Sequence, residues 1–446
     1  MKAFLDRLHN KLGDFWWYSL MLFVACRSTD VLNMFVGLWL VPKYIGPQEL
    51  GAVMPLTSFA NMLALPVSVF ATTFTKEVNT LASGGEFGKM KSLIRSVFVF
   101  AAAFLIIAIC ITKLTFPLFL ERIRVAEGSL AVLIIAASFI GCVSPIYSGV
   151  LQALKRFNAF SLLCIISSPV RFLTMLATMP FRALSGYFVG QAASPAASMI
   201  LSVFFLRKEL SVKAEPYWAR PVIKRFMRIF LGVGISSAVG MLLGLVEQTI
   251  LRQRLPALDS AAYYMVTRFS EIATLISGTL VLTLFPYTAE TAERGESTRP
   301  FVIKAAIPMA SFGILLALVF VFLGKPILTL LPNGDQYSTH ALAIPWLIGI
   351  TTVNSLQSFH INTEISACRF AFLKWWVPVH VISTLLLLAI TGYGYFTDYI
   401  PASWADFLSI HNITSLSAML WWMTIQALLK FAFCIADLVR QDPIRR

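Results

Sequence analysis

Charged side chains within long apolar stretches are the part of this sequence with the clearest chemical meaning. Three arginines lie in such stretches, namely Arg27, Arg171 and Arg268. Asp30 and Glu271 follow two of them by three positions, a spacing that places both members of a pair on one face of a helix. A guanidinium group binds two phosphate oxygens at once, which the ammonium group of lysine does not. These five residues are therefore the predicted binding site for an anionic substrate that carries phosphate.

The same arginines have a structural interpretation, which the sequence leaves open. A charge within a membrane helix costs about 2.5–3.5 kcal/mol on insertion scales, so it faces a cavity or a partner. Arg27 with Asp30, and Arg268 with Glu271, could equally be ion pairs that clamp neighbouring helices. The presence of three arginines against few acids within the membrane nevertheless favours an anionic cargo.

Three further residues, Glu247, His360 and Glu364, are the predicted sites for a coupling ion. Glu247 lies near the outer end of its apolar stretch, where it either binds a proton or sodium ion or pairs with Arg252 or Arg254. Histidine is the side chain that most readily exchanges a proton near neutral pH, so His360 could bind a coupling proton, but it could also have a hydrogen-bonded packing role. His360 and Glu364 share a polar stripe, which could line a water-filled path.

The composition indicates the class of protein to which these residues belong. Of 446 residues, 58% are hydrophobic and 13% are charged, whereas soluble domains carry about 25% charged residues. The sequence therefore predicts an all-α polytopic membrane protein, and its net charge of +14 does not indicate nucleic-acid binding. A membrane crossing needs about 20 apolar residues. By that criterion, twelve stretches are predicted membrane helices: 15–42, 49–72, 93–120, 128–153, 158–181, 184–206, 226–251, 260–287, 302–331, 338–366, 372–396 and 413–437.

The basic residues determine the predicted orientation. With the N-terminus inside, the cytoplasmic segments hold 25 lysines and arginines, and the opposite loops hold 8. Under the positive-inside rule, both termini are predicted to be cytoplasmic. Residues 1–14 are predicted to form an interfacial amphipathic helix, 207–225 a basic cytoplasmic linker that contacts membrane lipids, and 438–446 a cytoplasmic tail.

The cysteines give no sign of a metal centre. The six cysteines are scattered, without a Cys-x-x-Cys pair, and lie in or beside apolar stretches. Free cysteine behaves there as a small apolar residue. The sequence therefore predicts neither a disulfide framework nor a zinc site, and no cofactor is expected.

The two halves of the chain repeat each other weakly. A shift of 210 positions aligns Glu49 with Asp259, and it aligns the Gly-Glu pair at 85–86 with the one at 295–296. The first two membrane helices therefore correspond to the seventh and eighth, in the same orientation. Such parallel repeats form two lobes with the substrate site at their interface. The two predicted six-helix lobes are 15–206 and 226–437.

Short motifs carry a family resemblance. They are Tyr44-Ile45-Gly46-Pro47-Gln48-Glu49-Leu50-Gly51, Gly85-Glu86-Phe87 and Phe285-Pro286. With the twelve-helix layout, they resemble the O-antigen type flippases, the polysaccharide-exporter branch of the multidrug/oligosaccharidyl-lipid/polysaccharide (MOP) superfamily. The resemblance implies a two-lobed transporter of the bacterial inner membrane that moves polyprenyl-diphosphate-linked oligosaccharide by alternating access. It also implies partners such as a polysaccharide polymerase or a glycosyltransferase.

Two other functions fit parts of the sequence. A cation-coupled multidrug antiporter of the multidrug and toxic compound extrusion type needs membrane carboxylates for its ion and for cationic drugs, but the arginines here balance or outnumber the acids. A membrane glycosyltransferase or ligase needs acidic residues on a sizeable outer loop. The longest such loop, 397–412, offers only Asp398 and Asp406 beside His411. The sequence therefore favours a transporter that is not an enzyme.

Overall fold

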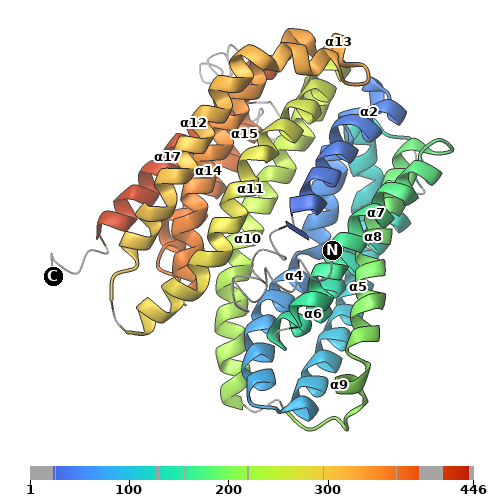
Figure 1. The fold of residues 1–446 in the computed structure, drawn as a ribbon. Helices are drawn as coiled ribbons and strands as arrows, with labels where there is room; N and C mark the ends of the chain where they lie inside the picture. Colours follow the sequence, from blue (N-terminus) through green and yellow to red (C-terminus); the bar gives the residue numbers. More distant parts are fainter. Residues whose placement is uncertain are drawn as a thin grey trace, which may run out of the picture. The chain divides into compact units, whose positions relative to one another are not determined.

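A computed structural model describes residues 24–390 and 415–440, apart from the single positions 26, 127, 129, 155, 218, 219, 295 and 368. The predicted lead-in helix 1–14, the loop 397–412 and residues 441–446 lie outside this part of the chain. Within it, every regular element is a helix (Figure 1). The prediction of an all-α fold is confirmed.

The helices follow one another through short connections. Residues 27–35 are helical and lead into η1, a turn of π-helix. In chain order the elements are η1 (Val36–Leu40), α2 (Val41–Tyr44), α3 (Pro47–Leu50), α4 (Val53–Ser83), α5 (Phe87–Ile123), α6 (Leu130–Ala153), α7 (Phe157–Thr178), α8 (Ala183–Phe205), α9 (Arg207–Ser211), α10 (Arg220–Arg254), α11 (Ala257–Glu293), α12 (Arg299–Thr329), α13 (Gly334–Tyr337), the 3₁₀ turn η2 (Ser338–His340), α14 (Ala343–Ser366), α15 (Leu373–Ile390) and α17 (Leu416–Arg440).

Each of the twelve stretches predicted to cross the membrane overlaps helical residues. Among the described residues, eight helical stretches are long and apolar enough to cross a membrane, and Leu373–Ala389 is a shorter apolar helix. Several helices extend beyond their predicted limits. For example, α5 begins at Phe87, whereas the predicted stretch began at 93. The apolar criterion missed the first residues of this helix because they include Lys89 and Lys91. Basic residues of this kind belong at the membrane–water interface.

Large apolar side chains cover the outside of the helices. Leu114 on α5 is 76% exposed, and Phe322 on α12 is 77% exposed. A soluble monomer rarely exposes contiguous apolar patches larger than a few hundred Å². These side chains are accommodated if hydrocarbon surrounds the helices, as the composition predicts.

The chain divides into two compact units. Unit 1 comprises Met1–Tyr44, Ala60–Glu121 and Ala126–Gly234, and unit 2 comprises Ile45–Phe59, Arg122–Val125 and Ile235–Arg446. Helices α4, α5 and α10 thus each contribute residues to both units. The lobe limits inferred from the sequence remain a prediction.

Aromatic and aliphatic side chains of α4, α5, α6 and the first part of α10 form the core of unit 1. Phe74 and Met90 are fully buried, and the rings of Phe70 and Phe100 stack with centroids 4.6 Å apart. Beside this core, α7 packs along α8, and α8 packs against α6 (Figure 1). This packing fixes α7, the helix that carries Arg171.

Gly186 on α8 allows a close approach to the end of α7. A Cβ atom at this position would lie 2.6 Å from the backbone nitrogen of Met179, which cannot move aside as a flexible side chain does. We expect Gly186→Ala to lower the free energy of unfolding by about 2 kcal/mol, a usual cost of overpacking. The measurement is the melting temperature of the purified protein. Gly141→Ala is the matched control, since a Cβ there meets no atom within 4 Å; equal melting temperatures would contradict the predicted effect.

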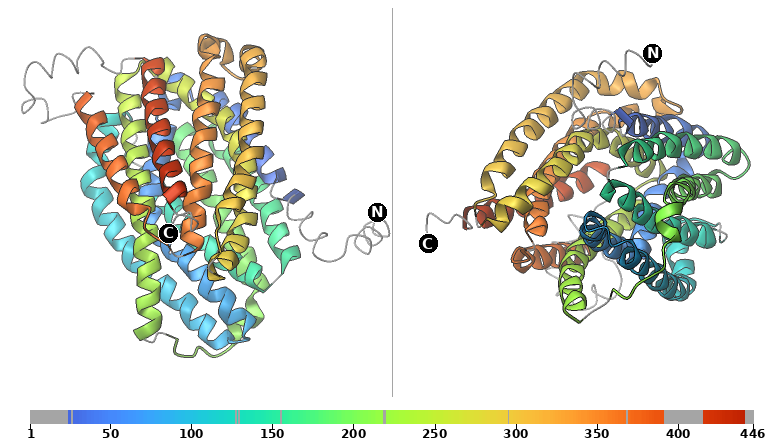
Figure 2. Two further views of the ribbon diagram at one scale, coloured as in Figure 1. Left: turned by 90° about the vertical axis from the view of Figure 1, so that its left-hand side faces the viewer. Right: turned by 60° about the horizontal axis from the view of Figure 1, so that its bottom comes forward.

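Helix α14 lies within unit 2 between α12 and α17, and it also packs on α11 (Figure 2). Polar side chains join α14 to α17 along its length. Trp346 Nε1 donates a hydrogen bond to Thr424 Oγ1 at 2.9 Å, and Gln357 Nε2 donates to the carbonyl of Ala427 at 2.8 Å. These bonds fix how the two helices face each other.

The segment 207–225, predicted as a linker, begins as α9 and then follows the surface of unit 1. The backbone nitrogen of Glu215 donates to the carbonyl of Gly88 at 3.0 Å. Tyr217 donates its hydroxyl proton to Glu77 Oε2 at 2.7 Å. Protein contacts therefore fix the path of this segment before α10 begins.

Candidate functional site

Arg27 and Asp30 form the ion pair that their spacing predicts. Arg27 Nη1 lies 3.0 Å from Asp30 Oδ2, and the two side chains are 26% and 31% exposed. Between them in the sequence, Thr29 Oγ1 donates to the carbonyl of Cys164 on α7 at 2.8 Å. The ion pair therefore lies on a helix that contacts α7, and its partial exposure leaves it accessible.

Arg171 on α7 contacts the same helix. Its Nη1 donates to Asn33 Oδ1 at 3.1 Å, and its Nε is buried without a hydrogen-bond partner among the described residues. Sequence analysis missed Asn33 because its amide is uncharged, although it follows Asp30 by three positions. Arg27, Asp30, Asn33 and Arg171 together form the N-terminal polar cluster, whose two arginines and one carboxylate give a formal charge of +1.

A π-helical turn follows this cluster directly. The backbone N–H of Val41 donates to the carbonyl of Val36, five positions earlier instead of the four of an α-helix. The rings of Phe35 and Trp39 stack with centroids 5.1 Å apart, and Lys43 Nζ lies 4.5 Å from the Trp39 ring. Turns of π-helix are rare and occur frequently at functional sites.

Arg268 and Glu271 form the second predicted pair, within unit 2. Arg268 Nη1 lies 3.0 Å from Glu271 Oε2. The guanidinium group also contacts Met54 Sδ at 3.1 Å, and its central carbon lies 5.1 Å from the Tyr264 ring, a cation–π distance. The five predicted substrate residues thus form two groups: Arg27, Asp30 and Arg171 in unit 1, and Arg268 and Glu271 in unit 2.

Glu247 on α10 has neighbours that sequence analysis did not identify. Trp422 and Gln426 of α17 lie beside its carboxylate. Lys430, also on α17, is the basic side chain that interacts electrostatically with it. These three residues are spaced four apart on α17, so they lie on one face of that helix. The spacing within α17 was visible in the sequence, but nothing in it linked that face to α10.

Arg252, one candidate partner of Glu247, contacts backbone carbonyls instead. Its Nε donates to the carbonyl of Ile123 at 3.0 Å, and its Nη2 donates to the carbonyl of Gln48. The residue is only 4% exposed. It therefore joins three separate segments of unit 2.

We expect Arg252→Ala to lower the free energy of unfolding by about 2 kcal/mol, because two buried carbonyls lose a charged donor. Denaturant unfolding of the purified protein measures the change. Lys325→Ala is the control, since Lys325 is an exposed cation on α12. If both variants unfold at the same denaturant concentration, the carbonyl contacts of Arg252 do not stabilise the fold.

His360 lies against α17. Its Nε2 is 2.9 Å from Asp437 Oδ2, and the residue is only 1% exposed. Glu364, one turn later, is equally buried. The structure thus places both residues among packed helices, and a role for them in binding a coupling ion stays a prediction. Asp437 was missed because only the folded chain brings it to His360.

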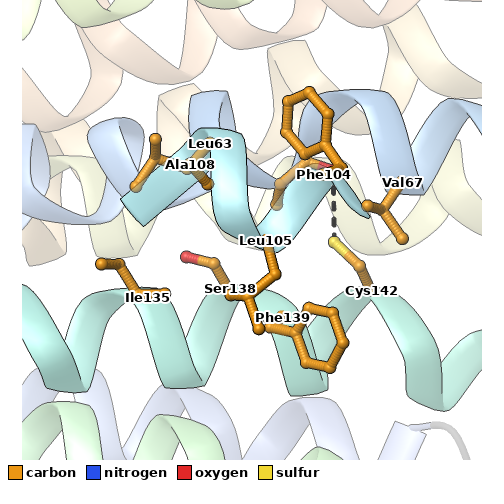
Figure 3. A pocket seen from close by; sticks show the side chains of 10 residues that line it. Leu63, Val67, Phe104, Leu105, Ala108, Ile135, Ser138, Phe139 and Cys142 are labelled. Atoms are coloured by element: carbon orange, nitrogen blue, oxygen red, sulfur yellow. Dashed lines mark hydrogen bonds between the residues drawn. The ribbon is translucent and has the colours of Figure 1, made fainter. Parts of the chain in front are cut away.

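Metal ligands are not clustered in the described ranges, where no group of three or more His, Cys, Asp and Glu side chains could hold an ion. An apolar cavity lies between α4, α5 and α6 (Figure 3). Phe104 and Ser138 are among its lining residues, and Cys142 Sγ donates to the carbonyl of Ala64 at 3.3 Å. Its free volume of about 20 Å³ is roughly the space of one water molecule. The cavity is therefore too small and too apolar to bind a saccharide diphosphate.

Comparison with known proteins identifies the fold. No family model and no curated protein matches the sequence. An inward-facing multidrug resistance MATE family transporter of the MOP superfamily matches with a TM-score of 0.66 and 12% identity, over 92% of this chain and 95% of that one. An outward-facing MATE family transporter matches with a TM-score of 0.61 and 13% identity, over 96% and 97%.

A third similar structure is a MOP superfamily transporter from Pyrococcus furiosus, for which reverse polarity of the binding pocket is described as suggesting a different function. It matches with a TM-score of 0.61 and 12% identity, over 94% of both chains. The chain therefore has the two-lobed fold of these transporters, as the sequence resemblance predicted.

Proposed function

We propose that this chain is a translocase that moves polyprenyl-diphosphate-linked oligosaccharide across the bacterial inner membrane by alternating access. The observation that carries the proposal is the N-terminal polar cluster, where Arg27 pairs with Asp30 and Arg171 contacts only the uncharged amide of Asn33, so that two arginines accompany one carboxylate. A formal charge of +1 held among membrane helices attracts an anionic headgroup and repels a cationic one. The polyprenyl chain would stay in the surrounding lipid.

Within this proposal, the arginines bind the diphosphate and their neighbours position them. Arg27 and Arg171 donate hydrogen bonds to phosphate oxygens, a geometry that suits the planar guanidinium group. Asp30, at 3.0 Å from Arg27, and Asn33, at 3.1 Å from Arg171, hold the two side chains in place. In unit 2, Arg268 has the same role, positioned by Glu271 and Tyr264.

The fold supports the alternating-access part of the proposal. Similar structures include both an inward-facing and an outward-facing conformation. The Pyrococcus furiosus transporter has a pocket described as reversed in polarity. Pocket charge therefore varies within this fold, as a change from cationic to anionic cargo requires. The same proposal includes a polysaccharide polymerase or a glycosyltransferase as a partner protein of this chain.

The alternative is a cation-coupled multidrug antiporter, which the fold supports equally. Its carboxylates must be available to a coupling ion or a cationic drug. Here Asp30 and Glu271 each lie 3.0 Å from an arginine. These side-chain cations compete with any cation from outside, so the electrostatics favour the translocase.

The test is the accumulation of lipid-linked saccharide on the cytoplasmic face of cells whose surface polysaccharide depends on this chain. We expect accumulation with Arg27→Ala and with Arg268→Ala when both proteins reach the membrane at the wild-type level. Arg182→Ala is the control, because Arg182 is exposed ahead of α8. Normal export in both variants would make the arginines structural and would favour the antiporter.

A further inference from the structure

Positive charge is concentrated in residues 207–228 of unit 1, which comprise α9, the connection that follows it and the first turns of α10. This range holds seven basic and two acidic side chains. Five of the basic side chains are exposed, and none of the five forms an ion pair with another described residue. They are Arg207, Lys208, Lys213, Lys224 and Arg228, and together they are called the basic surface.

The nearby acidic side chains do little to neutralise this surface. Glu209 forms an ion pair with Arg156, at the start of α7. Glu86 lies 2.9 Å from Lys89, at the start of α5. Glu215 is thus the one exposed carboxylate within 207–228 to set against the five cations. The surface keeps an excess of positive charge that is available to a ligand.

Contacts with α5 hold the cations in position. Lys91 Nζ donates a hydrogen bond to the carbonyl of Val212 at 2.8 Å, and the backbone nitrogen of Glu215 donates to the carbonyl of Gly88 at 3.0 Å. The segment between α9 and α10 therefore runs along one end of unit 1 (Figure 1). Because the backbone is already ordered, a ligand of the basic surface does not have to fix its path.

The basic surface borders side chains that suit hydrocarbon. Phe204, on the last turn of α8, is 58% exposed, and the guanidinium carbon of Arg207 lies 5.2 Å from its ring. On α10, the exposed Ile223 directly precedes Lys224, and the same order of apolar and basic residue recurs one turn later. Basic side chains that extend from an apolar surface place their charge at the membrane–water boundary. Lipid phosphates lie at that level.

We propose that the basic surface is a binding site for acidic phospholipids. Its cations come from α9, from the connection and from α10, so they can contact several phosphate groups of a bilayer at once. A guanidinium group such as that of Arg207 binds phosphate oxygens well. The exposed Phe204 and Ile223 contact the acyl chains, which a soluble anion does not have. The lipid contact predicted for 207–225 thus becomes a site selective for acidic lipids that extends to α8 and α10.

The test is the melting temperature of the full-length protein in detergent micelles that contain either phosphatidylglycerol, which is anionic, or phosphatidylcholine, which is zwitterionic. Wild type is expected to melt about 4 °C higher with phosphatidylglycerol, because a ligand of the folded state stabilises it. Sodium chloride at about 1 M should remove most of this shift, since the Debye length falls to about 3 Å. The variant Lys208→Gln/Lys213→Gln/Lys224→Gln removes one cation from each of the three segments and is expected to lose at least half of the shift.

A matched triple variant, Lys113→Gln/Arg182→Gln/Lys325→Gln, is the control. It removes three exposed cations near the end of α5, ahead of α8 and in unit 2, and it should keep the full shift. Glycerophosphoglycerol, the headgroup without acyl chains, should not change the melting temperature of wild type.

Four results would overturn the proposal. They are an equal melting temperature of wild type with both lipids, a full shift in the first triple variant, an equal loss of shift in the control, and a shift with the free headgroup as large as that with the intact lipid. If the first triple variant does not fold, its three single variants replace it, and the proposal fails if all three keep the full shift. The cargo has no part in these measurements, so their outcome is independent of the translocase proposal.

Discussion

Asn33→Asp is expected to reduce export of the lipid-linked saccharide about tenfold or more, which corresponds to about 1.4 kcal/mol of lost interaction. In the wild-type protein, Arg171 Nη1 lies 3.1 Å from the amide oxygen of Asn33. The substitution keeps the size of this side chain but replaces the amide with a carboxylate. The N-terminal polar cluster then changes from a formal charge of +1 to zero. Its attraction for a diphosphate falls accordingly. The measurement is the rate of headgroup transfer in proteoliposomes that contain the purified protein.

Asn33→Ala is the matched variant, because it removes the hydrogen bond to Arg171 but keeps the charge of +1. We expect it to retain more transport than Asn33→Asp. A cluster that only clamps α7 to the first helix predicts the opposite order, since the carboxylate would strengthen the clamp and alanine would weaken it. Wild-type export together with a raised melting temperature in Asn33→Asp would therefore exclude the binding role.

Asp437→Ala is expected to lower the free energy of unfolding by about 3 kcal/mol, because it removes the partner of a buried histidine. His360 is 1% exposed and its Nε2 lies 2.9 Å from Asp437 Oδ2. The change can be followed by tryptophan fluorescence during denaturant unfolding, since Trp346 and Trp421 pack edge to face where α14 meets α17.

Asp437→Asn is the conservative control, because it keeps an oxygen acceptor and should cost less. The double variant His360→Phe/Asp437→Ala tests the coupling. Replacing both partners by apolar groups removes the unsatisfied donor and is expected to recover part of the loss. The single variants His360→Phe and Asp437→Ala complete the cycle. If the loss of stability in the double variant equals the sum of their two losses, the two residues act independently.

Local features of the fold and of the candidate site could be predicted from the sequence. Both arginine–carboxylate pairs join residues three positions apart, and both are found at 3.0 Å. Helix geometry alone brings such residues together, so no knowledge of the tertiary structure is needed. The membrane helices could also be predicted from local sequence, because each of them depends on a continuous apolar stretch.

Contacts between distant parts of the chain could not be predicted. Arg171 and Asn33 are 138 positions apart, and His360 and Asp437 are 77 apart. Periodicity shows which side chains share a helix face but not which helix lies opposite. Sequence proximity also misled in one case, since Arg252 contacts backbone carbonyls rather than the nearby Glu247.

The π-helical turn at Val36–Leu40 has a consequence for insertions and deletions in this region. A π turn holds one residue more than an α turn. Deleting any one residue within 36–40 would restore the regular α-helix and rotate the preceding residues by about 100°, the angle of one helical position. The side chain of Asn33 would then point away from Arg171 on α7. A single deleted codon here would thus disrupt the cluster as completely as replacing its side chains, although every one of them remains in the sequence.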